Sequence, residues 1–234
     1  MAKTQTIVKK IFQLGGVDIR RYDQSQTMFR NLFKKYKDFT MIPEHSFMSN
    51  LELINHYKHL EGDYVECGVW RGGMSAAIGE ILKKSKTIHL FDSFEGLPPA
   101  KEIDGKEALA WQKNVNAPGY FNNCMAEESN AKKAMSLAGC ENYQIHKGWF
   151  NQTLPLFKNN AIGILRLDGD WYESIMDCLS YLFPQVLNNG IVLLDDYYTW
   201  DGCSKAVHDY LSGIKSPSRV HQWNNQIAYI IKKG

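Results

Sequence analysis

Hydrophobic residues in the first quarter of the chain recur every three or four positions, the spacing of an amphipathic helix. This pattern predicts helices over most of residues 5–60, interrupted at residues 40–43 and ended by Gly62, a residue suited to the position after a helix. The apolar stripes consist of Phe29, Leu32, Phe33 and Tyr36, followed by Phe47, Leu51, Ile54 and Tyr57. Packing against the rest of the protein or against a second subunit explains such stripes.

Beyond Gly62, short apolar runs of β type alternate with helical stretches. Strands separated by helices imply a parallel sheet with right-handed crossovers. The last two runs are separated only by a short turn, which predicts an antiparallel hairpin. The seven predicted strands are residues 63–67, 87–92, 142–146, 161–168, 190–195, 218–222 and 226–232.

Residues 98–125 are the least regular part of the chain, with two prolines at the start and Pro118 and Gly119 inside. A connection of this length is usually mobile or functional, so we interpret it as a lid or a substrate-side insertion. We divide the chain into a helical lid or interface segment, residues 1–61, and a main unit, residues 62–234, which together form effectively one domain.

Composition narrows the class of protein. The chain has 234 residues, 44% hydrophobic and 22% charged, which suits one soluble globular domain with a sizeable core. A net charge of +2 gives no reason to expect nucleic acid or an anionic membrane as a partner. Five scattered cysteines without C-x-x-C spacing predict reduced thiols. With no membrane-length apolar run and no secretory signal, we expect a cytoplasmic protein.

A glycine-rich turn follows the first predicted strand. Gly68, Gly72 and Gly73 lie between that strand and a stretch with helical spacing. The first amides of a helix are unpaired donors, and in an open α/β sheet such a loop holds a nucleotide-like cofactor. The pattern is G-x-x-x-G-G rather than the G-x-G-x-x-G of dinucleotide folds, so the loop alone does not identify the ligand.

Asp92 ends the second predicted strand, 24 positions after Gly68. A carboxylate about 20 residues beyond a glycine loop can accept hydrogen bonds from a ribose diol. The alternative is that Asp92 caps the next turn, which Ser93 begins.

Four more aspartates end neighbouring predicted strands: Asp168 and Asp170 end the fourth, and Asp195 and Asp196 end the fifth. Carboxylates that meet at one edge of a parallel sheet repel one another unless a cation joins them. Oxygen ligands without a nearby His/Cys set favour Mg²⁺ over zinc. The alternative for any single aspartate is a cap on the following helix.

Five short segments carry a family resemblance. They are VECGVWRGG, FDSFEGLPP, KGWFNQTLP, LRLDGDWYES and IVLLDDY, in that order. Together they resemble the macrocin O-methyltransferase family (TylF/MycF-like), class I S-adenosylmethionine-dependent enzymes that methylate sugar hydroxyls with the help of Mg²⁺. The resemblance covers roughly residues 39–210. It implies a doubly wound, Rossmann-like sheet and an acceptor that is a sugar or a glycosylated metabolite.

The resemblance also implies site residues. The cofactor contacts would be Met41, Glu66, Gly68, Val69, Arg71, Gly72, Ser75, Asp92, Ser93, Trp149 and Asp168. The metal ligands would be Asp168, Asp195 and Asp196, and Asp168 would also be the general base, with Asp170 and His146 as reserves. For Glu66 the alternative is a salt bridge to an arginine, and for Trp149 a place in the core. Related catechol-type enzymes place a lysine where this chain has Trp171, so a lysine base of that kind is absent.

Other functions remain open at this point. Asp168-Gly169-Asp170 is also the D-x-D pattern of metal-dependent glycosyltransferases, although that function would not account for Glu66 or Asp92. A metal-independent methyltransferase and a non-catalytic cofactor-binding protein are further alternatives. The missing G-x-G-x-x-G disfavours a nicotinamide-dependent oxidoreductase. We expect a homo-oligomer, since dimers are the commonest assembly.

Overall fold

The computed structural model describes residues 24–234, so the helix expected over residues 5–23 lies outside the described part of the chain. A seven-stranded sheet with the order β3-β2-β1-β4-β5-β7-β6 forms the centre of the protein. Strands β1 to β5 are parallel, and β7 is antiparallel to both β5 and β6. The predicted α/β fold with a C-terminal antiparallel hairpin is confirmed. The strands are β1 (Asp63–Cys67), β2 (Ile88–Asp92), β3 (Tyr143–Lys147), β4 (Ile162–Leu167), β5 (Val186–Leu194), β6 (Arg219–Trp223) and β7 (Ile227–Ile231).

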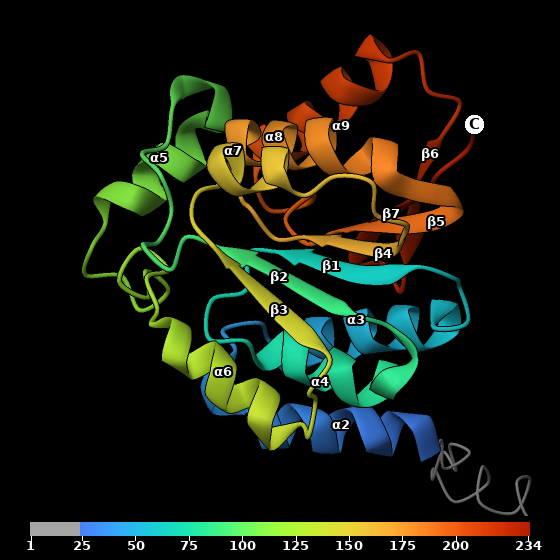
Figure 1. Ribbon diagram of the computed structural model, residues 1–234. Coiled ribbons are helices and arrows are strands. Elements are labelled where there is room, and N and C mark those ends of the chain that lie inside the picture. The colour runs from blue at the N-terminus through green and yellow to red at the C-terminus, as the bar shows by residue number, and fades with distance from the viewer. Residues whose placement is uncertain (1–23) are drawn as a thin grey trace, which may run out of the picture.

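Helices cover both faces of the sheet, as Figure 1 shows. One face carries α2 (Gln24–Tyr36), α3 (Glu44–Tyr57), α4 (Gly73–Leu82) and α6 (Glu128–Leu137). The other carries α7 (Phe150–Thr153), α8 (Tyr172–Leu182) and α9 (Asp201–Gly213). Within residues 24–234, none of these helices has the length and apolar character needed to span a bilayer.

The sheet separates two hydrophobic cores, because successive side chains of a strand point to opposite faces. Tyr64 and Ile164 belong to the core beneath α2, α3 and α4, whereas their neighbours Val65 and Leu165 belong to the core beneath α8 and α9. The central strands are therefore apolar on both faces. Parallel strands that are covered on both sides have this continuous hydrophobic character.

Strand β5 begins four residues before the predicted position. Val186 pairs with Ile162, and the register then shifts so that Ile191 pairs with Ile164. The extra residues form a bulge with Asn189 at a φ of 66°. Polar residues in a bulge have the composition of a loop, so the sequence pattern placed the start of the strand after them.

Residues 98–125 contain a helix that the sequence did not predict, α5 (Gly105–Lys113), directly after a short 3₁₀ turn (Glu102–Asp104). The buried Asp104 side chain accepts hydrogen bonds from the backbone amides of Lys101 and Tyr172, both at 2.7 Å. The Trp111 ring packs edge-on against Trp171 and Trp200, with ring centroids 6.1 and 6.0 Å apart. These contacts fix this segment to the beginnings of α8 and α9.

Candidate active site

A cavity of about 380 Å³ lies beyond the carboxyl ends of β1, β2, β4 and β5. This is the edge of an open α/β sheet at which ligands bind. Residues 40–43, which interrupt the N-terminal helices as predicted, form part of the wall together with Phe39. The predicted site residues in the wall are Met41, Glu66, Gly68, Val69, Asp92, Ser93, Trp149, Asp168, Asp170, Asp195 and Asp196.

Three glycines shape the turn between β1 and α4, and each makes room for another part of the protein. A Cβ at Gly68, where φ is 86°, would lie 1.7 Å from the carbonyl oxygen of Asp168. A Cβ at Gly72 would lie 2.8 Å from the Cα of Ala131, and one at Gly73 would lie 2.6 Å from a carbonyl oxygen of the 39–43 segment. In the structure, all three bring the turn close to neighbouring backbone.

Two predicted cofactor contacts in this turn lie outside the cavity wall. Gly72 faces α6, and the Arg71 guanidinium stacks on the Trp70 ring, 4.4 Å from its centroid. Trp70, which the sequence did not single out, lines the cavity instead. The turn that the resemblance points to does line the cavity, but the resemblance could not distinguish residues that face the cavity from those that face solvent or α6.

Asp92 holds the same turn in place. Its Oδ2 accepts the backbone amides of Val69 and Trp70, both at 2.7 Å, and its Oδ1 accepts the amide of Phe94 at 2.6 Å. Burial raises the pKa of Asp92, whereas these three amides lower it. Since each carboxylate oxygen has about two acceptor positions, little capacity remains for a ribose diol. The structure therefore supports the alternative, in which Asp92 fixes local backbone, at least as well as the predicted ribose contact.

Glu66 is almost completely buried, with 1% of its surface exposed. Its Oε2 accepts the hydroxyls of Tyr64 at 2.9 Å and Ser75 at 2.7 Å, and its Oε1 accepts Nη1 of Arg166 at 2.9 Å. Burial raises the pKa of Glu66, while Arg166 and the two hydroxyls lower it. The alternative, a salt bridge to an arginine, is what the structure contains. Ser75, a predicted cofactor contact, donates to Glu66 and lies outside the cavity wall.

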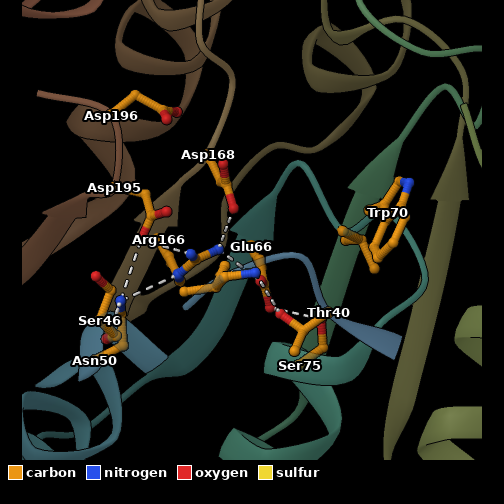
Figure 2. Close-up of polar contacts among 12 residues, drawn as sticks. Thr40, Ser46, Asn50, Glu66, Trp70, Ser75, Arg166, Asp168, Asp195 and Asp196 are labelled. Atoms are coloured by element: carbon orange, nitrogen blue, oxygen red, sulfur yellow. Dashed lines mark hydrogen bonds and ion pairs between the residues drawn. The ribbon is translucent and has the colours of Figure 1, made fainter. Parts of the chain in front are cut away.

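Arg166 is the cation at the centre of these acidic residues, and the sequence analysis did not predict it as a site residue. Besides Glu66, Nη1 donates to Oδ2 of Asp168 at 2.9 Å, and Nη2 lies 2.7 Å from Oδ1 of Asp195. Its Nε donates to Oδ1 of Asn50 at 3.3 Å (Figure 2). Burial opposes the charge, but the surrounding carboxylates raise the pKa of Arg166 well above its usual value. An arginine within the apolar run of β4 was the available signal, because arginine is rarely buried without partners.

The three predicted metal ligands converge. One carboxylate oxygen from each of Asp168, Asp195 and Asp196 lies within 4.8 Å of the corresponding oxygens of the other two. In each, one oxygen bonds to protein: Oδ2 of Asp168 and Oδ1 of Asp195 to Arg166, and Oδ2 of Asp196 to the amide of Asp170 at 3.1 Å. Within residues 24–234, the other oxygen of each has no hydrogen-bond or ion-pair partner.

Burial and the neighbouring carboxylates raise the pKa values of Asp168 and Asp196 well above the usual range, although Arg166 lowers that of Asp168. A bound cation would remove this repulsion and favour the charged forms. Three carboxylates with a free oxygen each are the donor set that Mg²⁺ prefers. The residues present therefore fit a magnesium ion.

The two reserve bases differ in position. Asp170 lines the cavity, accepts the indole N–H of Trp200 at 2.8 Å, and has a pKa that burial raises to about 7. His146 lies outside the cavity wall, because its ring stacks on Phe91 with centroids 4.2 Å apart and its Nε2 is 3.3 Å from Nδ1 of His89. Strand pairing sets His146 beside Phe91, so both side chains face the core beneath α7. The geometry contradicts a role for His146 as the base.

The rest of the wall comes from segments that are distant in sequence. Ser46 of α3 donates to Oε1 of Gln226 in the β6–β7 turn at 3.4 Å, and Tyr198 and Thr199 follow β5. Nothing local in the sequence marks these residues. Ser46 and Gln226 meet because α3 packs against β7 of the sheet.

Known proteins with similar sequences match most of this chain. The family model described as macrocin-O-methyltransferase (TylF) matches residues 28–230. Demethyldecarbamoylnovobiocin O-methyltransferase of Streptomyces niveus is 35% identical over 65% of this chain and 59% of that protein. A 4'-O-methyltransferase of Streptomyces olivaceus, named for a rhamnosyl-tetracenomycin C, is 34% identical over 67% of this chain. The match covers 61% of that relative, so the chain spans about three fifths of both relatives.

Solved structures agree with these sequence matches. The structure of the O-methyltransferase NovP superposes with a TM-score of 0.68 and 27% identity, over 84% of this chain and 83% of that one. The calicheamicin methyltransferase CalS11 shares the fold at 18% identity, with a TM-score of 0.62 over 92% of this chain and 95% of that one. The sheet order, the aspartate set and the family match over residues 28–230 lead to the same conclusion. The chain belongs to the macrocin O-methyltransferase family.

Proposed function

We propose that the protein is an S-adenosylmethionine-dependent, Mg²⁺-assisted O-methyltransferase that acts on a hydroxyl of a sugar or a glycosylated metabolite. One observation carries this proposal: a single cavity is lined both by the glycine turn after β1 and by the convergent aspartates Asp168, Asp195 and Asp196. Methyl donor and activated hydroxyl must meet in one place, and residues suited to each line this cavity. The names of the sequence relatives, which are O-methyltransferases, support the reaction class.

The cofactor half-site would use the residues that line the cavity around the glycine turn. Met41, Gly68, Val69, Ser93 and Trp149 supply backbone and apolar surface there. S-adenosylmethionine would supply the methyl group on a cationic sulfur, which suits the acidic side chains of this wall. A volume of about 380 Å³ lies within the range of small-molecule sites. Arg71, Gly72 and Ser75 would act only indirectly, through the shape of the turn and through Glu66.

The acceptor half-site would use the aspartates. A Mg²⁺ ion held by Asp168, Asp195 and Asp196 would lower the pKa of the acceptor hydroxyl and orient its oxygen. We assign proton acceptance to Asp168, with Asp170 as the reserve, because both carboxylates line the cavity. Methyl transfer is mainly a problem of position, since the reacting atoms must be in line and about 3 Å apart. Residues 39–43 and the 98–125 segment would help to exclude water.

The decisive experiment measures transfer of labelled methyl groups to a panel of glycosylated acceptors, with Mg²⁺ and with excess chelator. Asp168→Asn should bind S-adenosylhomocysteine like the wild type in calorimetry but lose about 100-fold or more in turnover. Asp209→Asn, which alters an exposed aspartate paired with Lys205 on α9, is the matched control and should keep full activity. Undiminished transfer in chelator would remove the Mg²⁺ part of the proposal. Binding of nucleotide diphosphates but not of S-adenosylhomocysteine would replace it with the glycosyltransferase alternative.

A further inference from the structure

Arg166 lies in the cavity wall, is 0% exposed, and contacts acidic residues of both halves of the proposed site. We infer that Arg166 is a positioning residue: its guanidinium fixes the free oxygens of the cation ligands and couples them to the cofactor turn through Glu66. This inference rests on the proposed function. It assigns a role to a side chain that neither the donor set nor the reaction itself requires.

Arg166 determines which carboxylate oxygens of the aspartates remain free. Arg166 binds Oδ2 of Asp168 at 2.9 Å and approaches Oδ1 of Asp195 at 2.7 Å. The opposite oxygen of each aspartate is the one without a protein partner in the described chain. The guanidinium is a rigid planar fork, so its hydrogen bond to Asp168 and its ion pair with Asp195 favour one rotation of each carboxylate, and the Asn50 amide holds the same oxygen of Asp195. A free carboxylate would instead turn to solvent or to its neighbours.

Arg166 is also connected to the glycine turn after β1, through Glu66. The Nη1 atom that binds Asp168 also donates to Glu66, and Glu66 accepts the Ser75 hydroxyl from the first turn of α4. On the opposite side, Nε donates to Asn50 of α3, whose amide donates in turn to Asp195 at 3.1 Å. One buried cation therefore connects α3 and α4 with the ends of β1, β4 and β5. Figure 2 shows these contacts around the guanidinium.

The charge of Arg166 and the geometry of its guanidinium can be tested separately. Arg166 is 0% exposed, and it neutralises part of a strongly acidic site. A lysine at this position would keep the charge but lose the fork. If charge alone mattered, lysine would serve as well as arginine. If position matters, lysine weakens binding in both half-sites even though the net charge is unchanged.

The test measures two ligands separately on full-length protein: Mn²⁺ alone by electron paramagnetic resonance, and S-adenosylhomocysteine alone by calorimetry. Arg166→Lys should raise the Kd for Mn²⁺ by about 10- to 100-fold, the usual cost of removing a partner of a metal ligand, and should also raise the Kd for S-adenosylhomocysteine. Asn50→Ala removes one partner of Asp195 and the acceptor of Arg166 Nε but leaves the Arg166–Glu66 contact, so it should weaken Mn²⁺ binding more than S-adenosylhomocysteine binding. Ser75→Ala, which frees only Glu66, should weaken S-adenosylhomocysteine alone.

The readout distinguishes positioning from general damage to the fold. A variant that is merely destabilised binds with lower stoichiometry and an unchanged Kd. Arg166→Lys with unchanged Kd values for both ligands would overturn the inference while leaving the proposed function intact. If Arg166→Lys does not fold, the test rests on Asn50→Ala and Ser75→Ala. The inference is overturned if each of these variants changes the Kd values of both ligands equally, or changes neither. Wild-type protein that binds neither ligand would refute the proposed function itself.

Discussion

Gly68 offers a sharp test of how the turn after β1 is built. A methyl group at this position would overlap the carbonyl oxygen of Asp168, 1.7 Å away, and the backbone φ of 86° would disfavour any side chain. Gly139 is the matched control. Its φ is 62°, but no atom lies within 4 Å of the position that a Cβ would take. Alanine at the two positions therefore shares the conformational penalty and differs in the clash.

The expected loss of unfolding free energy is the sum of the backbone penalty and the steric penalty. A non-glycine residue in the left-handed region costs about 1–2 kcal/mol, which is the whole loss expected for Gly139→Ala. Relief of an overlap in a packed region adds about 1–3 kcal/mol, so Gly68→Ala should lose about 2–5 kcal/mol of unfolding free energy. Because the overlapping atom belongs to Asp168, the folded fraction of this variant should also bind Mn²⁺ less tightly.

Urea denaturation followed by circular dichroism measures the difference. With a slope of about 2 kcal/mol per molar urea, an additional loss of about 2 kcal/mol lowers the midpoint by about 1 M relative to Gly139→Ala. Equal midpoints for the two variants would refute the reasoning, because they would mean that the turn moves away from Asp168 at no cost.

Two further predictions concern residues outside the cavity. Asp104→Ala leaves the backbone amides of Lys101 and Tyr172 without their acceptor, so it should lower the unfolding free energy by about 1–3 kcal/mol. It should also speed limited proteolysis within residues 98–125. Unchanged cleavage would show that Asp104 does not anchor the segment. Burial and the neighbouring His89 lower the pKa of His146, so the unfolded chain binds its proton first and stability falls as the pH drops below about 6.5. His146→Phe should therefore lose less unfolding free energy than wild type between pH 7 and pH 5 in urea titrations, and should keep its methyl transfer at neutral pH. Equal losses would contradict the first expectation, and lost activity the second.

The fold could be predicted because its signals are local. Short apolar runs between helical stretches marked every strand, and the lengths of the connections distinguished the parallel strands from the hairpin. Glycines between strand and helix located the turn, and aspartates after two strands predicted the cluster, since parallel strands end at one edge of the sheet. The start of β5 and helix α5 were missed, because a bulge and a short polar helix look like loop in a periodic pattern.

The sequence by itself determined the order of the elements, the family and the set of acidic residues at the edge of the sheet. Only the tertiary structure decided what the site residues contact. Glu66 pairs with Arg166, Asp92 accepts backbone amides, and Gly68 lies against the carbonyl of Asp168. It also decided that His146 faces the core beneath α7. A period of two tells which side chains share a face of a strand, but the packing of distant segments determines what that face meets.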